Sequence, residues 1–275
     1  MRRPELGAEE FRSADGHDQR PGLEPAREQR LVAGGVAHVV SSDGGGAMAM
    51  SRGWVFALTI AIGLPIAATD LGGLLDRWVA EALVVAWCWG LFLHDHVTAD
   101  RRRRIEMWTV LAFATPMELF FSEVWLIYEY QHGLMPLFVP VGHWFLFDLG
   151  RRVAHALVDR PVKWSPLLLL PLVAYGAFTG TGTVEVVLFI GMLLFIRFGP
   201  DPALYAVMTW LALAMELWGT WLGNWAWAAD VPWLGLTSWN PPLLVGSFYG
   251  LGDLLVGLAV RWRLGQGSSE ANLTS

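Results

Sequence analysis

Residues 115–150, TPMELFFSEVWLIYEYQHGLMPLFVPVGHWFLFDLG, decide how the chain is interpreted, because ionisable groups stand inside an otherwise apolar stretch. These groups are Glu118, Glu123, His143 and Asp148. Ionisable side chains are costly inside a bilayer, so they usually serve a function or pair with one another. A similar pattern returns at 215–255, where Glu216 and Asp253 lie among apolar and aromatic residues. The remainder of the chain is interpreted as the scaffold that holds these two regions together.

Composition predicts a membrane protein rather than a soluble one. The 275 residues are 54% hydrophobic and include 16 tryptophans, and the mean hydropathy is +0.42. The net charge of −6 gives no reason to expect a nucleic-acid partner, because the acidic excess is shared between an N-terminal tail and the apolar stretches. The single cysteine, Cys88, excludes an internal disulfide and forms no metal-binding pattern. We therefore expect no metal. The only lysine, Lys163, lies in a predicted loop, which excludes a retinal Schiff base, and no P-loop motif appears, so we also expect no cofactor.

Apolar windows predict an all-α, polytopic membrane bundle with about eight transmembrane helices. The windows are residues 54–69, 78–97, 105–128, 134–153, 164–179, 183–198, 203–227 and 241–262. Most of the Lys and Arg residues fall in alternate connections, such as Arg101 to Arg104, whereas the other connections hold only Arg77. By the positive-inside rule, this asymmetry predicts a multi-pass protein of the cell membrane with both termini in the cytoplasm.

Matches between the two halves predict a parallel duplication of a four-helix unit. The segments Met117-Glu118-Leu119 and Met215-Glu216-Leu217 correspond, and Asp148 corresponds to Asp253. Tyr128-Glu129-Tyr130 likewise answers Trp225-Ala226-Trp227. Residues 51–160 and 161–265 are the expected repeats, between disordered tails at 1–50 and 266–275. Duplicated membrane folds commonly place their site between the halves.

Four ionisable residues are the candidate catalytic groups: Glu118, Glu216, Asp253 and His143. Glu118, Glu216 and Asp253 are expected near mid-membrane, where a carboxyl group is either protonated or paired with a hydrogen-bond donor. The candidate donors are His143, Asn224, Tyr249 and a tryptophan N–H, and Tyr249 lies one helical turn from Asp253. Either state suits proton transfer. Alternatively, Glu118 and Glu216 are symmetric struts that hydrogen-bond between helices.

Aromatic residues crowd the same region. Trp221 and Trp225, four residues apart, share one helix face and flank Glu216. A protonating acid among Trp and Tyr faces suits carbocation chemistry on an alkene, because the ring faces stabilise positive charge. Packing remains the alternative for each ring, and Trp227 and Trp233 near the span ends are expected in an interfacial belt.

The chain resembles the membrane-embedded carotenoid-biosynthesis proteins that include the carotenoid hydratases. The likeness lies in Glu118 with Tyr128-Glu129-Tyr130, in Val139-Pro140 with Trp144, in Trp225-Ala226-Trp227, in residues 232–236 (PWLGL), and in Asn240. The resemblance implies addition of water to an isoprenoid double bond in the membrane without a redox cofactor. It adds Trp144 and Asn240 to the candidate substrate-binding residues, beside Tyr128, Trp221, Trp225, Asn224 and Tyr249.

Three hypotheses follow. The first is an enzyme acting on a carotenoid or polyprenyl lipid, with Glu118 or Glu216 as proton donor, Asp253 or His143 as its partner, and Tyr128, Trp221 and Trp225 shielding the cation. The second is a proton-coupled transporter or lipid-binding membrane protein that uses the same carboxylates. The third is a noncatalytic membrane scaffold. A long, closed, aromatic-lined tunnel open to lipid favours the first, and water access that alternates between the two faces favours the second. A dry, fully packed interface between the halves favours the third. The expected partner is a membrane lipid or another hydrophobic small molecule.

Overall fold

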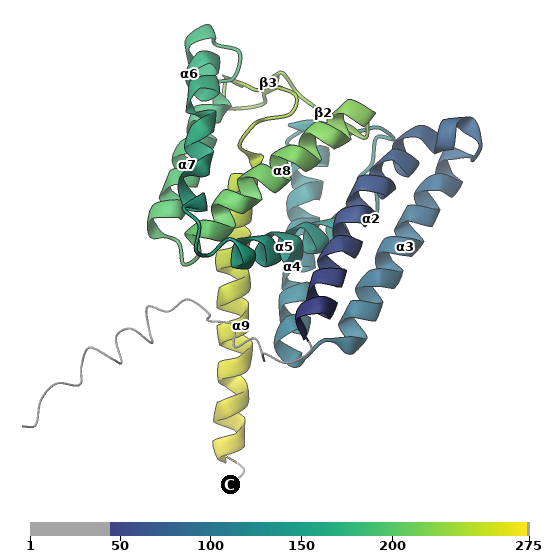
Figure 1. Cartoon of the computed structure of the whole chain (residues 1–275). Helices are drawn as coiled ribbons and strands as arrows, with labels where there is room; N and C mark the ends of the chain where they lie inside the picture. The colour runs from purple at the N-terminus through teal and green to yellow at the C-terminus, as the bar shows by residue number, and fades with distance from the viewer. Residues whose placement is uncertain (1–44, 274–275) are drawn as a thin grey trace, which may run out of the picture. The chain divides into compact units, whose positions relative to one another are not determined.

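The computed structural model describes residues 45–273, and the chain there is mostly helical (Figure 1). The first half contains α2 (Gly45–Gly73), α3 (Arg77–Thr98), α4 (Arg101–Leu119), the π-helical turn η1 (Phe120–Val124), the strand β1 (Tyr128–Tyr130) and α5 (Val139–Ala156). The second half contains η2 (Val162–Leu169), α6 (Leu170–Thr179), α7 (Val184–Phe198), α8 (Pro202–Leu222), β2 (Trp225–Trp227), β3 (Asp230–Val231), β4 (Leu236–Thr237), η3 (Val245–Ser247) and α9 (Phe248–Leu273). Most of the expected N-terminal tail lies outside the described residues, whereas 266–273 continue the backbone of α9.

Short polar and glycine signals set the ends of several helices. The carboxylates of Asp76 and Asp100 accept hydrogen bonds from the backbone of the first turns of α3 and α4. Asp201 does the same for α8, which carries Pro202 in its first turn. Gly180 and Gly223 end α6 and α8 in the left-handed conformation that glycine adopts without steric cost. These boundaries leave α4 and α8 ending shortly after their glutamates.

Two strands replace the helix that was expected at the end of spans 105–128 and 203–227. β1 and β2 pair antiparallel, with Tyr128 opposite Trp227 and Tyr130 opposite Trp225. Aromatic residues favour the strand conformation and pack well across a strand pair. The prediction that helix continues through Tyr128 and Trp227 was therefore wrong, and the two halves are joined by this pair. β3 and β4 form a second antiparallel pair.

The core is centred on α5 and α8. α5 packs against α2, α4 and α8, while α2 and α3 lie side by side (Figure 1). Trp144, Phe145 and Phe147 of α5 are fully buried. Gly150 lets α5 approach Met208 of α8, because an added Cβ would lie 2.1 Å from its sulfur. The close contact of these two helices sets the position of the residues that follow α8.

Three segments within residues 45–273 are long and apolar enough to cross a membrane. They are Arg52–Thr69, Val162–Thr179 and Pro202–Leu222, which match three of the expected spans. The other five windows stay predictions. Many large apolar side chains are exposed on the surface, including Trp87, Phe178 and Ile190. A surface of this kind is typical of contact with lipid or with another protein.

Candidate functional site

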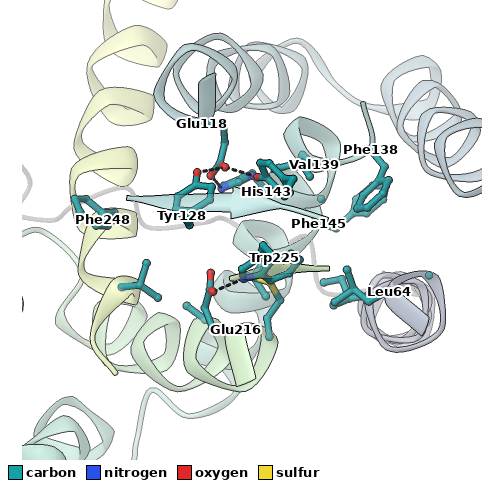
Figure 2. A pocket seen from close by; sticks show the side chains of 18 of the residues that line it. Leu64, Glu118, Tyr128, Phe138, Val139, His143, Phe145, Glu216, Trp225 and Phe248 are labelled. Atoms are coloured by element: carbon teal, nitrogen blue, oxygen red, sulfur yellow. Dashed lines mark hydrogen bonds and ion pairs between the residues drawn. The ribbon is translucent and has the colours of Figure 1, made fainter. Parts of the chain in front are cut away.

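A cavity lies between the two halves and is lined by residues of α2, α3, α4, η1, β1, α5, α8, β2, η3 and α9 (Figure 2). The space open to the centre of a water molecule inside it is about 120 Å³. One water needs roughly 10–15 Å³ of such space, so the cavity has room for an organic group. Most of the lining side chains are apolar or aromatic. Figure 2 shows Glu118 and Glu216 reaching the cavity from opposite sides.

Glu118, near the end of α4, is held by three side chains. Its Oε2 accepts hydrogen bonds from the hydroxyls of Tyr128 and Tyr130, the latter at 2.6 Å. Its Oε1 lies 3.0 Å from Nε2 of His143. Burial, followed by the charge of Glu118, raises the pKa of the Tyr130 hydroxyl well above its ordinary value. Tyr130 therefore stays protonated and continues to donate to Glu118.

His143 shares one proton with Glu118. Its Nδ1 lies 3.0 Å from the carbonyl oxygen of Val139, which can only accept, so Nδ1 carries a hydrogen. A hydrogen bond between Nε2 and Oε1 of Glu118 then needs a second proton, held on one atom or the other. The imidazole ring also stacks on Tyr249, with ring centroids 5.9 Å apart. The shared proton is thus enclosed between two protein atoms rather than directed into the cavity.

Glu216, near the end of α8, has a different set of partners. Its Oε2 accepts hydrogen bonds from the indole nitrogens of Trp225 at 2.7 Å and Trp227 at 2.9 Å. An indole N–H is a donor only and cannot take up a proton. Among the described residues, no side chain or backbone group forms a hydrogen bond with Oε1, which borders the cavity. If Glu216 is protonated, its proton is on Oε1, next to whatever fills the cavity.

The two carboxylates are built on one pattern. Each glutamate lies near the end of a helix and accepts two hydrogen bonds from the first and third residues of the strand that follows. Because β1 and β2 are antiparallel neighbours, the four donors come from a single strand pair. The donors are hydroxyls at Glu118 and indoles at Glu216. Beside Glu118, His143 can also hold a proton, whereas neither indole beside Glu216 can.

The cavity brings together six of the candidate residues that the sequence indicates. They are Glu118, Tyr128, His143, Glu216, Trp225 and Tyr249. Each of the other five lies elsewhere. Trp144 is fully buried and donates to Asp95 at 3.2 Å. Trp221 is 74% exposed and stacks on Trp218.

The two asparagines support the backbone around the strands. Asn224 donates from Nδ2 to the carbonyl oxygen of Leu64 at 3.2 Å. Asn240 accepts from the backbone N–H of Trp227 at 3.0 Å. Both hold β2 and its neighbours in place without lining the cavity. Their contribution to the site is through the position of Trp227 and the strand that carries it.

Asp253 belongs to a second, ionic cluster and not to the cavity. Its carboxylate accepts from Tyr205 at 3.0 Å and from Arg151 at 3.3 Å. It is therefore not placed as the partner of either glutamate. The expected hydrogen bond from Tyr249 to Asp253 is also absent among the described residues, whose contacts with Asp253 are those of Arg151 and Tyr205.

The ionic cluster pairs buried carboxylates with arginines near the ends of α3, α4 and α5. Arg103 lies 2.6 Å from Asp148 and 2.8 Å from Asp95. Burial by itself would lower the pKa of Arg103, but the two carboxylates raise it above its ordinary value. Asp148 also accepts from Arg152 at 2.7 Å. These groups neutralise one another where the helices are packed, which is a structural role.

Sequence reasoning missed part of the site. Trp227, expected in an interfacial belt, instead donates to Glu216, and Tyr130 donates to Glu118 beside Tyr128. A signal was present, because alternate residues of a strand face the same side and each strand carries aromatics at its first and third positions. The helical interpretation of these segments concealed it.

Comparison with known proteins identifies no relative, so the function must be argued from the geometry of the site. The scan against protein-family models finds no match, and neither do the searches of curated proteins and of solved structures. In residues 45–273, no group of three or more His, Cys, Asp or Glu side chains is placed to hold a metal ion.

Proposed function

We propose that the chain is an integral membrane enzyme that protonates and then hydrates a carbon–carbon double bond of an isoprenoid lipid, such as a carotenoid. The observation that carries this proposal is the environment of Glu216. Two donors that cannot take up a proton hold its Oε2, while Oε1 faces an apolar, aromatic cavity without a protein partner. Burial without a cationic partner favours the neutral acid, which is the form that donates a proton.

The reaction begins with transfer of the proton on Oε1 of Glu216 to the less substituted carbon of the double bond. The π electrons form the new C–H bond and leave positive charge on the more substituted carbon. The indole N–H groups of Trp225 and Trp227 stabilise the carboxylate that remains, as preorganised donors do in other enzymes. Their inability to accept a proton keeps the acid directed at the substrate.

Water then completes the addition. Its oxygen gives a lone pair to the cationic carbon, and the surplus proton returns to Glu216, so the acid ends as it began and the net product is a tertiary alcohol. Tyr128, Trp225 and Trp227 line the cavity with ring faces that can stabilise the cation before water attacks. Glu118 accepts hydrogen bonds from Tyr128 and Tyr130 and so holds them in position. The proton that Glu118 shares with His143 lies between these two residues and is not donated to the substrate.

We further propose that the protein is a multi-pass protein of the cell membrane, with about eight spans, both termini in the cytoplasm and a duplicated four-helix unit. Three apolar helical segments support the membrane location. The repeated arrangement of glutamate, helix end and aromatic strand supports the duplication. A second correspondence also supports the duplication. Arg103 contacts Asp148 in the first half, and Tyr205 contacts Asp253, the residue that corresponds to Asp148, in the second.

A second candidate function is favoured by the same two carboxylates. A cavity with aromatic faces and two acids also suits a lipophilic ammonium ion, which could exchange with protons during transport. Proton flux into vesicles that contain the protein, measured on addition of such an ion, would distinguish transport from hydration. A steady flux that depends on Glu216 supports transport, whereas hydration requires none.

The experiment that tests the enzyme is mass spectrometry of lipid extracts from cells that make acyclic carotenoids and express the protein. We expect a product heavier by one water with the wild type, none with Glu216→Gln, and a reduced amount with Glu118→Gln. Each variant is normalised to the protein recovered in the membrane. If Glu216→Gln forms as much product as the wild type, Glu216 is not the proton donor. If the lipid profile is unchanged although wild-type protein is present in the membrane, the result favours the transport hypothesis.

A further inference from the structure

The two ends of the cavity differ in how far their walls are exposed. At the end formed by α2, α3 and the adjoining part of α5, most of the large lining side chains are buried, while Ile60, Gly63, Val139 and Gly142 are partly exposed. The buried side chains include Thr59, Leu64, Val84, Cys88, Phe138 and Phe145, none of which is more than 7% exposed. In Figure 2, Leu64 and Phe138 mark this side of the cavity. The buried side chains from these three helices pack across this more closed end of the cavity, which we call the blind pocket.

The opposite end lies at the seam between α4 with η1 and α9. Here the lining residues Phe113, Phe121, Phe248 and Tyr249 are only partly buried. The rings of Phe121 and Phe248 meet across the seam, with centroids 5.5 Å apart and planes tilted by 51°. Both side chains belong to the wall of the cavity as well as to its edge. The contact between these two rings closes the seam beside the cavity, and Phe113 of α4 packs against Gly252 of α9 next to it.

The surface beside this seam is apolar. On one side, Leu119 and Phe120 are 42% and 41% exposed, and on the other, Leu251 and Leu255 are 45% and 38% exposed. Side chains of this kind contact the hydrocarbon of a bilayer without cost, whereas in water they would form an unfavourable patch. An opening at this seam would therefore lead into lipid and not into the aqueous phase.

We infer that the seam between Phe121 and Phe248 is a lateral portal, through which one end of a linear polyprenyl chain passes from the bilayer into the blind pocket between α2 and α3. The class of ligand rests on the proposed function. The chain passes between Glu118 and Glu216, so the first chain end to enter lies beyond the carboxylates and the rest stays in the portal and the membrane. An acyclic end fits this arrangement, and a bulky ring at that end does not.

Two glycines keep the cavity open. An added Cβ at Gly142 would meet no atom within 4 Å, and one at Gly63 would meet only Cγ1 of Val84 at 3.5 Å. Both residues line the cavity. A larger side chain at Gly142 can therefore occupy space that the ligand needs without first displacing protein atoms. This makes Gly142 a residue that determines how much of a chain the cavity accepts.

Photolabelling tests the direction of the chain without relying on catalysis. The probe is a linear polyprene with an alkyl diazirine at one chain end, added to membranes that contain the full chain and then illuminated. We expect the label on the α2 and α3 residues of the blind pocket, and an excess of unlabelled polyprene should suppress it. A probe with the diazirine at mid-chain should instead label Phe121, Phe248 and their neighbours.

Gly142→Leu is the informative variant, and Gly257→Leu is its control. An added Cβ at Gly257 also meets nothing within 4 Å, but this residue does not line the cavity. We expect Gly142→Leu to reduce competable labelling of α2 and α3 by at least about tenfold, which corresponds to 1.4 kcal/mol, and Gly257→Leu to leave it unchanged.

Two outcomes would overturn the portal. One is labelling by the chain-end probe mainly on α4 and α9, and the other is labelling that excess polyprene does not suppress. Loss of the hydration product with intact labelling would overturn the proposed reaction but not the portal, so the two failures can be told apart.

Discussion

Tyr128 and Trp227 stand directly opposite each other in the β1–β2 pair, and each donates a hydrogen bond to a different buried carboxylate. Their ring centroids are 4.7 Å apart. Tyr128 serves Glu118, from the first half, and Trp227 serves Glu216, from the second. The strand pair therefore couples the positions of the two acids, so a shift of one strand would disturb the donors of both.

The indole donors of Glu216 give the first prediction. Replacing both Trp225 and Trp227 by Phe keeps aromatic rings in the cavity wall but removes the two N–H groups. The carboxylate left after proton donation then loses its stabilisation, and we expect product formation to fall by roughly 10²-fold. The measurement is hydrated product per amount of protein in the membrane. Trp221→Phe, at an exposed position outside the cavity, should retain wild-type activity.

Gly219 gives the second prediction, because it is the reason that Trp225 can reach Glu216. An added Cβ at Gly219 would lie 2.1 Å from the Trp225 ring, so Gly219→Ala must displace the indole. We expect about a tenfold or greater loss of product as this donor moves away. The shift of the indole should also change the near-ultraviolet circular dichroism.

Gly257→Ala is the control for this variant, since an added methyl group there meets open space. It should leave both product formation and the tryptophan spectrum unchanged. Full activity in Gly219→Ala with an altered spectrum would show that the Trp225 hydrogen bond does not assist the reaction.

The helical class, and the choice of Glu118 and Glu216 as candidates that both line the cavity, could be predicted from sequence, because apolar windows and isolated carboxylates are local signals. The strand pair could not, because aromatic segments of three residues at the end of an apolar window fit a helix equally well. Their conformation is decided by pairing between Tyr128–Tyr130 and Trp225–Trp227, which are far apart in the chain.

Asp253 was expected to pair with a glutamate because it lies at a similar depth in the membrane, and this expectation was wrong. Instead, Arg151 of α5 and Tyr205 of α8 donate hydrogen bonds to its carboxylate. Spacing along one helix gives the neighbours on that helix and not those on packed helices. The arginines were expected to set topology, and no local pattern indicated that they would pair with buried carboxylates.

The pair of Arg103 and Asp148 gives the third prediction, which concerns stability. Asp148→Asn removes a buried carboxylate and leaves Arg103 and Arg152 with less compensation. Breaking such a pair from one side costs roughly 3–5 kcal/mol. We expect a lower midpoint of thermal unfolding in detergent than for the wild type. Glu129→Gln, which alters an exposed carboxylate of β1, should unfold like the wild type, and equal midpoints for both variants would contradict a stabilising ion pair.

Tyr130 gives a prediction about pH. An unfolded tyrosine ionises near pH 10, whereas the folded pKa of Tyr130 is raised by burial and by Glu118. The unfolded state therefore binds fewer protons than the folded state above about pH 10, and the stability contributed by this group is lost as the pH rises further.

Tyr130→Phe removes both the hydrogen bond and this dependence on pH. At neutral pH we expect the variant to be less stable by roughly 1.5–3 kcal/mol, because a hydrogen bond to a charged group is lost. The difference from the wild type should be constant below about pH 9 and should narrow above about pH 10. Thermal unfolding of both proteins across this range provides the measurement. A difference that stays constant through the alkaline range would mean that Tyr130 ionises alike in the folded and unfolded states, and that its hydroxyl is not held against Glu118.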